Sequence, residues 1–250
     1  MPEQSQHAAL ITGAGRRIGA AIARALADAG YAVVLHARAR ADAEALAQEI
    51  VARGGRAHVV LADLADHQAV RGLMTAAAVF GPVSLLVNNA STFEPDDIAT
   101  LERGSFERAI AVNLAAPLFL AQAFAAQAPG GASIVNILDQ RVFKPTPRFL
   151  SYTLSKSALQ TATVTLAQAL APKVRVNAVA PGPTLPSPRQ SEAQFAEQAA
   201  TLPLQKGPGP EDIAAAVVYL AKAKSVTGVT IAVDGGQHVA WRTPDSDVAE

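Results

Sequence analysis

Residues 9–19 of this chain read Ala-Leu-Ile-Thr-Gly-Ala-Gly-Arg-Arg-Ile-Gly, an apolar run that ends in a glycine-rich turn. An alanine-rich segment with helical periodicity follows, so the turn lies where a buried strand leads into a helix. Gly13, Gly15 and Gly19 are spaced one residue wider than the G-x-G-x-x-G dinucleotide fingerprint. Glycine lets the backbone approach a phosphate, and a helix N-terminus offers free N–H groups and a positive dipole end. The stretch predicts a pyrophosphate-binding turn, with an ordinary glycine turn of an α/β protein as the alternative.

Length and composition limit the classes of protein to consider. The 250 residues suit one α/β domain with a sizeable core. Basic and acidic residues both number 21, so no global positive field favours nucleic acid or an anionic membrane. Cysteine is absent, which excludes disulfides, cysteine-ligated zinc and a cysteine nucleophile, and we expect no metal site. Residues 1–7 have no signal-peptide layout and no apolar run approaches the ~18 residues of a membrane span, so we expect a cytoplasmic protein.

Short apolar runs alternate with alanine-rich helical stretches along the chain. We predict strands at 8–12, 31–36, 57–61, 83–88, 132–138, 174–179 and 229–233. We predict helices near 17–29, 40–53, 66–79, 104–127, 151–171 and 210–222. This alternation favours an α/β fold in which helices cover both faces of a parallel sheet. We find neither a repeat nor a second domain, so residues 1–250 are expected to form one domain.

The segment 181–210 interrupts this alternation. It follows the strand predicted at 174–179 and holds Pro181, Pro183, Pro186, Pro188, Pro203, Pro208 and Pro210. Long insertions in compact domains are usually functional, and ligands of open α/β sheets bind beyond the carboxyl ends of the strands. We therefore predict a substrate lid over 181–210, with a surface excursion as the alternative. Residues 241–250 are expected to form a tail.

Tyr152 and Lys156 lie four residues apart on a predicted helix and therefore share one face. A phenol is a weak acid at pH 7, but a nearby ammonium favours the phenolate and lowers the pKa of the phenol. Such a tyrosine can give a proton to a substrate atom while a hydride arrives from the other side. Pairs at this spacing are common by chance, so the surrounding motifs decide the interpretation.

Those motifs occur in a fixed order: Thr12-Gly13, Gly19, Asp63-Leu64, Asn88-Asn89-Ala90, Asn113, Tyr152, Lys156 and Pro181-Gly182. Together they resemble the short-chain dehydrogenase/reductase superfamily over about residues 7–238. The resemblance implies a single Rossmann-type domain, which is a doubly wound parallel sheet, and a nicotinamide cofactor. The long helices near 104–127 and 151–171 resemble the oligomer-forming pair of that family, which implies a homotetramer.

The resemblance also implies a role for each matching residue. Tyr152 would be the proton donor, Lys156 would lower its pKa and hold the nicotinamide ribose, and Asn113 would support a water-linked proton relay. Asp63 would contact the adenine through its side chain, while Asn89 and Ala90 would line the adenosine ribose. The other predicted cofactor contacts are Gly13, Gly15, Arg16, Arg17, Ile18, Gly19, Leu64, Pro181 and Gly182.

Two departures from the common family pattern narrow the resemblance. Arg17 replaces the usual middle glycine of the turn, and Asp139 replaces the serine that usually stands thirteen residues before the tyrosine. With His36 after the second strand and the stretch Asn-Ala-Ser-Thr-Phe at 89–93, they resemble pteridine reductases and the bacterial short-chain dihydromonapterin/dihydrofolate reductases.

The chemistry of a pterin agrees with these residues, because a pterin is a flat heterocycle with amide and amine edges. Phe93 can stack on one face while the nicotinamide covers the other, although a core aromatic is the alternative. Arg17 can bind pterin atoms and reach a cofactor phosphate. Asp139 can accept from the pterin amino group, and a carboxyl beside Tyr152 can supply or relay the proton that C=N reduction needs. We predict that Arg17, Ser91, Phe93, Asp139 and Tyr152 bind the substrate.

The end of the second strand indicates the cofactor. NAD enzymes usually carry an acid about twenty residues after the glycines to hold the ribose 2′-OH. Residues 35–40 read Leu-His-Ala-Arg-Ala-Arg and hold no acid. Positive groups suit a 2′-phosphate, and Arg16, His36 and Arg38 are the candidates, with Arg40 less favoured. We therefore predict NADP(H) as cofactor.

The sequence thus predicts an NADPH-dependent reductase of a pterin ring C=N bond with a small-molecule substrate and neither a nucleic-acid nor a membrane partner. The predicted catalytic residues are Asn113, Asp139, Tyr152 and Lys156. A carbonyl reductase of 3-oxoacyl-carrier-protein or another ketone is the alternative enzyme. A non-catalytic dinucleotide-binding regulator is a third hypothesis, against which the intact Tyr152 and Lys156 argue.

Overall fold

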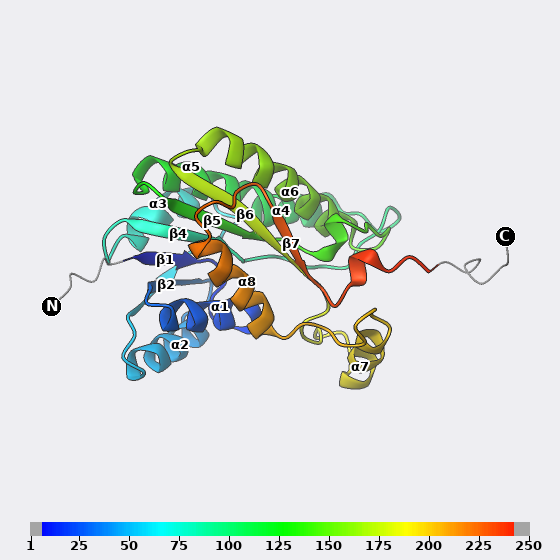
Figure 1. The fold of residues 1–250 in the computed structure, drawn as a ribbon. Coiled ribbons are helices and arrows are strands. Elements are labelled where there is room, and N and C mark those ends of the chain that lie inside the picture. Colours follow the sequence, from blue (N-terminus) through cyan, green and yellow to red (C-terminus); the bar gives the residue numbers. More distant parts are fainter. Residues whose placement is uncertain (1–6, 243–250) are drawn as a thin grey trace.

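The described strands pair in parallel into one sheet in the order β3-β2-β1-β4-β5-β6-β7 in the computed structural model, which describes residues 7–242. They are β1 (Ala8–Ile11), β2 (Ala32–Ala37), β3 (Ala57–Leu61), β4 (Val83–Asn88), β5 (Ala132–Ile137), β6 (Val174–Pro181) and β7 (Thr230–Val233). The strand order reverses between β1 and β4, which places successive helices on opposite faces (Figure 1). The predicted Rossmann-type, doubly wound parallel sheet is confirmed.

Helices cover both faces of this sheet (Figure 1). One face carries α1 (Arg17–Asp28), α2 (Arg40–Ala52) and α8 (Pro210–Lys222). The other carries α3 (His67–Ala77), α4 (Arg103–Ile110), α5 (Ala116–Gln127) and α6 (Leu150–Leu170). The short elements are the π-turn η1 (Ala111–Ala115), the 3-10 turns η2 (Gln140–Val142) and η3 (Gln237–Val239), and helix α7 (Glu192–Ala200) beyond β6.

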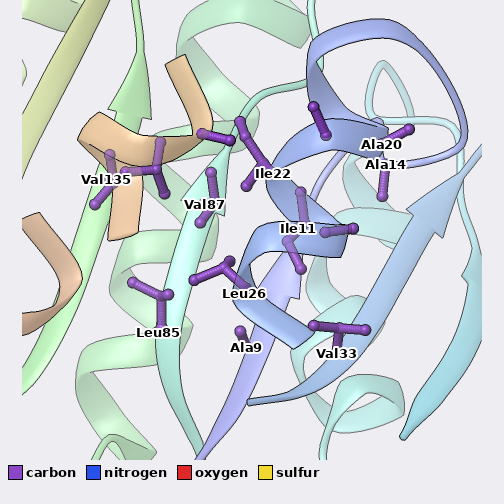
Figure 2. Close-up of a cluster of buried hydrophobic side chains, with 14 of the residues drawn as sticks. Ala9, Ile11, Ala14, Ala20, Ile22, Leu26, Val33, Leu85, Val87 and Val135 are labelled. Atoms are coloured by element: carbon purple, nitrogen blue, oxygen red, sulfur yellow. The ribbon is translucent and has the colours of Figure 1, made fainter. Parts of the chain in front are cut away.

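Neighbouring residues on the central strands point into opposite layers, so the sheet is buried on both faces. Ile11 and Val87 belong to the core cluster beneath α1 and α8, whereas Leu10 belongs to the cluster beneath α3 and α5. Figure 2 shows Ile11 and Ile22 packed between α1 and the sheet. Leu10 is paired in register with Val34 on β2 and Leu86 on β4, and all three are fully buried. This arrangement explains why the central strands are predominantly apolar.

The helix predicted over 104–127 is not regular. It divides into α4, the π-turn η1 and α5, and η1 contains Asn113. A π-turn within a helix often marks a functional position. The stretch Arg103–Gln127 is long and apolar enough to cross a membrane by length and composition alone. However, Leu120 and Phe124 of α5 are fully buried in the core cluster shared with α3 and β4, so packing accounts for part of its composition.

The proline-rich segment contains a helix, α7, that the sequence analysis missed. Its start is a capping box, in which Ser191 Oγ accepts from the Gln194 N–H and the Gln194 side chain accepts from the Ser191 N–H. The Ser-x-x-Gln pattern of this capping box is present in the sequence, but the prolines on both sides of it favour a loop. None of the α7 residues is buried, and α7 stands away from the sheet in Figure 1. The predicted tail lies outside the described residues from 243 onward.

Candidate functional site

The predicted site residues follow the ends of different strands. Gly13 follows β1, Asn89 follows β4 and Asp139 follows β5, while Gly182 comes directly after β6. Because parallel strands end at a common edge, the fold brings these positions together at the carboxyl edge of the sheet. Gly182 is needed for close packing, since an added Cβ would lie 2.6 Å from the Cα of Asp234.

The turn after β1 accepts only glycine at two positions. The φ of Gly13 is +65°, and an added Cβ there would lie 2.9 Å from the Cα of Ala90. An added Cβ at Gly19 would collide with the carbonyl oxygen of Gly13. The Asn89 side-chain amide donates to the carbonyl oxygens of Thr12 and Gly13 at 2.8 and 3.0 Å. β1 and β4 therefore hold this turn in one conformation.

The N-terminus of α1 is suited to a pyrophosphate. Arg16 is its N-cap residue and makes no side-chain capping bond, and the first turn contains no acidic residue. The backbone N–H groups there face no competing side-chain acceptor within the described chain, so they are available to an anion. Gly15 approaches α2 closely, since an added Cβ would lie 3.2 Å from the Ala43 nitrogen. The turn and the helix start together fit a dinucleotide.

His36 is buried beneath the turn rather than exposed, and its predicted contact with the 2′-phosphate stays a prediction. Its Nδ1 accepts from the Gly13 N–H at 3.2 Å, which leaves the ring proton on Nε2 to donate to the Ala62 carbonyl at 3.1 Å. The side chain is only 1% exposed, and burial lowers the pKa of His36. β2 directs this ring beneath the turn, where it braces Gly13 as a neutral group.

Arg16 and Arg38 are exposed and remain candidates for the 2′-phosphate. Arg38 directly follows β2, where the ribose of the predicted cofactor would lie. Arg40 is engaged elsewhere, because its guanidinium pairs with Glu44 on α2 at 2.8 Å. This ion pair agrees with the expectation that Arg40 is the less favoured candidate for the 2′-phosphate.

Asp63 lies beyond β3 as predicted. Its carboxylate accepts from the Ala65 N–H at 3.0 Å and from the Arg108 guanidinium at 3.3 Å. The Ala65 hydrogen bond, followed by that from Arg108, lowers the pKa of Asp63. The neighbouring Leu64 is buried in the core cluster beneath α3 and α5. The role of Asp63 toward adenine stays a prediction.

Tyr152 and Asp139 form a hydrogen-bonded pair, which joins the first turn of α6 to the end of β5. The buried Tyr152 hydroxyl donates to Asp139 Oδ2 at 3.0 Å. Asp139 also accepts from the Arg141 N–H at 2.8 Å and forms an ion pair with its guanidinium at 3.2 Å. Burial, and then Asp139, raises the pKa of Tyr152 well above its usual value. The phenol therefore keeps its proton in this arrangement.

Lys156 is buried, and its ammonium contacts the backbone of β5 rather than the Tyr152 hydroxyl. Its Nζ donates to the Ile137 carbonyl at 2.7 Å and lies 5.8 Å from the centre of the Tyr152 ring. Burial lowers the pKa of Lys156 to about 8. The expected lowering of the Tyr152 pKa by this ammonium is not met in this arrangement, because Ile137 holds the ammonium and the burial of Tyr152 dominates its pKa.

Asn113 connects the loop after β4 to α6. Its Oδ1 accepts from the Thr92 N–H at 2.9 Å and from Ser91 Oγ at 3.1 Å. Its Nδ2 donates to the Thr92 carbonyl and to Ser155 Oγ, each at 3.0 Å. The π-turn places this fully buried amide between the two elements, so its side chain acts as a brace. Ser91 and Ser155 of α6 thereby share the Asn113 side chain, and the role of Ser91 in substrate binding stays a prediction.

Phe93 belongs to an aromatic cluster at the site. Its ring stacks on Phe149 with centroids 4.3 Å apart and planes within 5°, and it meets the Tyr152 ring at 4.7 Å and 74°. Phe93 is only partly buried and belongs to none of the core clusters. One of its faces is covered by Phe149, so a stacked substrate needs the other face or a displaced Phe149. Its stacking role stays a prediction.

Asp96 anchors the start of α6, and no motif pointed to it. Its carbonyl accepts from the Phe149 N–H at 2.7 Å, and its carboxylate accepts from the N–H and the hydroxyl of Ser151. Phe149 has φ +58° and supplies no side-chain cap, so Asp96 satisfies the N–H groups that would otherwise lack partners. This contact fixes the turn that presents Tyr152.

Asp96→Ala is expected to lower the free energy of unfolding by about 0.5–2 kcal/mol, because the cap of α6 is lost. We also expect kcat to fall by roughly 10- to 100-fold, because Tyr152 loses its fixed position. Thermal unfolding and steady-state rates measure the two effects. Asp97→Ala is the matched control, since within residues 7–242 the Asp97 carboxylate bonds only to its own turn at 97–100. Equal behaviour of the two variants would contradict the anchoring role.

The proline-rich segment is tied to the site by two arginines. Arg17 lies at φ +54°, a conformation that favours the glycine it replaces, and its guanidinium donates to the carbonyls of Leu185 and Pro186 at 3.2 and 3.0 Å. Arg189 of the segment donates to the Phe93 carbonyl at 2.9 Å and pairs with Glu94 at 3.5 Å. These contacts place the segment next to the turn and the aromatic cluster, as a lid requires.

The comparisons with known proteins agree with this geometry. The family described as enoyl-(acyl carrier protein) reductase matches residues 13–238. The chain belongs to the short-chain dehydrogenase/reductase family. A crystal structure of FolM alternative dihydrofolate reductase 1 from Brucella canis, complexed with NADP, is 48% identical with a TM-score of 0.93, and the match covers 97% of each chain.

Two further relatives are less similar to this chain than the Brucella canis protein. Pteridine reductase 1 of Leishmania tarentolae is 34% identical over 91% of this chain and 95% of its own length. An uncharacterized oxidoreductase of Mycobacterium tuberculosis is 38% identical over 91% of this chain and 90% of its own length.

Several contacts of this short-chain site escaped the sequence analysis. They involve Asp96, Arg141, Phe149, Ser155 and Arg189. Ser155 and Arg141 stand close in sequence to predicted catalytic residues, which was the available signal. Asp96 and Arg189 act across large sequence separations, where a single sequence gives no signal.

Proposed function

We propose that this short-chain enzyme uses NADPH to reduce a ring C=N bond of a dihydropterin or dihydrofolate. The observation that carries the proposal is the Tyr152–Asp139 pair, 3.0 Å apart beside Phe93. A carboxylate there can accept from a ring amino group while the phenol donates to ring nitrogen. The similarity to FolM dihydrofolate reductases and to pteridine reductase 1 supports the same substrate class.

The residues at the carboxyl edge fit NADP(H), with which similar FolM structures are complexed. The turn at 13–19 and the N-terminus of α1 would hold the pyrophosphate, and Arg16 with Arg38 would hold the 2′-phosphate. Lys156, Asn89 and the residues around Asp63 would contact the two nucleosides. When bound, NADPH supplies the hydride that reaches the carbon of the C=N bond.

The chain itself supplies and replaces the proton. The Tyr152 O–H bond breaks as its proton passes to the ring nitrogen, so the hydride and this proton together saturate one C=N bond. The hydroxyl must first leave Asp139, which then accepts from the ring amino group. The Lys156 ammonium, whose Nζ lies 5.8 Å from the centre of the Tyr152 ring, would be the cation available to the resulting phenolate. Return of a proton to Tyr152 resets the enzyme.

NADPH is expected to bind at least roughly 10-fold more tightly than NADH, because arginine forms charge-assisted hydrogen bonds to a 2′-phosphate. Arg38→Ala should weaken NADPH binding by roughly 10- to 100-fold and leave NADH binding nearly unchanged. Calorimetric Kd values test both statements. Arg40→Ala is the matched control, because Arg40 pairs with Glu44. Equal affinity of the wild-type enzyme for the two cofactors would contradict the assignment.

The substrate is tested by following NADPH oxidation with dihydrobiopterin, dihydrofolate and an acetoacetyl thioester in parallel. The proposal expects turnover of at least one of the two pterin compounds. Turnover of the thioester without either pterin compound would instead establish a carbonyl reductase.

We also propose that the enzyme assembles as a homotetramer through α5 and α6. Phe119, Leu154 and Val164 on these helices are 43%, 49% and 42% exposed, and exposed apolar groups of this kind suit an interface. The cytoplasmic location stays a prediction.

A further inference from the structure

Arg141 joins the carboxylate of the site to its aromatic pair. Its backbone N–H donates to Asp139 at 2.8 Å, and its guanidinium Nη1 lies 3.3 and 3.2 Å from the two carboxylate oxygens. The same guanidinium lies 5.4 Å from the ring centres of both Phe93 and Phe149. Equal distances to two stacked rings place it beside the stack rather than over either outer face. The group therefore stands level with the edges of the rings.

The buried Nε donor of this guanidinium has no acceptor among the described residues. Arg141 Nε is buried and makes no hydrogen bond to any residue in the described part of the chain. Leaving a buried donor unpaired is unfavourable, so such a group calls for a functional or structural explanation. Nη1 already serves Asp139, so Nε is a second donor fixed in direction by the same ion pair.

Asp139 and Arg141 together present an acceptor next to a donor. A planar heterocycle that carries an amino group and an oxo group on one edge offers the complementary donor and acceptor. A guanidinium held by a carboxylate on one side can bind such an edge with its remaining N–H. Phe149 is partly buried and stacks on Phe93, and the guanidinium of Arg141 lies 5.4 Å from its ring centre, so a ligand that displaces Phe149 would enter next to this guanidinium.

We propose that Arg141 is a substrate-binding residue whose Nε–H donates to the ring oxo group of the heterocycle, next to the amino group that Asp139 accepts. This inference rests on the proposed function and deepens it, because it assigns a residue to the recognition of the ring oxo group that dihydropterins and dihydrofolate share. Arg141 then has two roles, because it forms the ion pair with Asp139 and donates a hydrogen bond to the substrate.

The test compares Arg141→Met on two substrates, a 2-amino-4-oxo dihydropteridine and the matching 2-amino dihydropteridine without the oxo group. We expect kcat/KM for the oxo compound to fall by roughly 10- to 100-fold and that for the other compound by less than about threefold. Arg141→Lys keeps the charge beside Asp139 but lacks Nε, so it should show the same selective loss. Calorimetric Kd values for NADPH show whether each variant is folded, and Kd values for both pteridines give a readout independent of turnover.

Arg189→Met is the matched control, because Arg189 lies 5.7 and 5.9 Å from the same two ring centres but donates to the Phe93 carbonyl. It should affect both pteridines equally. Equal losses on both pteridines in Arg141→Met and Arg141→Lys would overturn the inference and leave Arg141 with a structural role. Wild-type enzyme that neither binds nor reduces either pteridine would overturn the proposed function and this inference together, so the two failures are distinguishable.

Discussion

Tyr152→Phe is expected to lower kcat by roughly 10²- to 10⁴-fold, the range that a positioned general acid contributes. The substitution removes one hydroxyl and keeps the ring that meets Phe93, so the aromatic cluster stays packed. It also frees Asp139 from its contact with the phenol while the Arg141 ion pair remains. Because the hydroxyl contributes little to cofactor affinity, we expect the Kd of NADPH to change by less than about threefold.

Single-turnover and steady-state rates with NADPH measure the loss, and calorimetry measures the Kd. Tyr219→Phe is the matched control, since Tyr219 is 56% exposed on α8. That variant should keep the wild-type rate. A Tyr152→Phe enzyme that keeps more than about a tenth of the wild-type kcat would show that another group donates the proton.

The strands and the strand-end motifs were predictable because each depends on local sequence. A strand buried on both faces is predominantly apolar, and the positions of Gly13 and Gly19 have space for no other residue. Parallel topology then places residues from separate motifs at one edge, as it does for Asn89 and Asp139. The sheet and the general position of the site follow from these local requirements.

The parts that escaped prediction depend on contacts between distant segments. Residue type alone indicated a charge at His36, but the hydrogen bond from Gly13 and the burial beneath the turn make it neutral. Asp96 caps a helix 55 residues away in sequence, and Arg17 reaches carbonyls about 168 residues away. No periodicity or motif records such pairs. These long-range contacts fix the positions of the site residues, whereas the residue types determine the chemistry of the site.

Asp139→Ser is expected to separate the two candidate reactions. Serine stands at this position in the common family pattern, and its hydroxyl can donate to a carbonyl oxygen but lacks the charged acceptor of a carboxylate. Pterin reduction should lose at least ~10²-fold in kcat/KM, because the amino group of the ring loses its acceptor and Tyr152 loses its partner. Any side activity on a dicarbonyl compound should persist or rise, because that reaction needs only a donor at oxygen.

The comparison requires kcat/KM for one pterin and one dicarbonyl in the wild-type and variant enzymes. Arg141 loses its ion-pair partner in Asp139→Ser, so Asp139→Asn provides a second variant that keeps an acceptor oxygen beside Arg141 and should lose less pterin activity. An unchanged Kd of NADPH shows that both variants are folded. If pterin and dicarbonyl activities fall together in both variants, Asp139 supports Tyr152 in general and does not select a pterin. If they diverge, the carboxylate determines the substrate, because both reactions share the tyrosine, the lysine and the cofactor site.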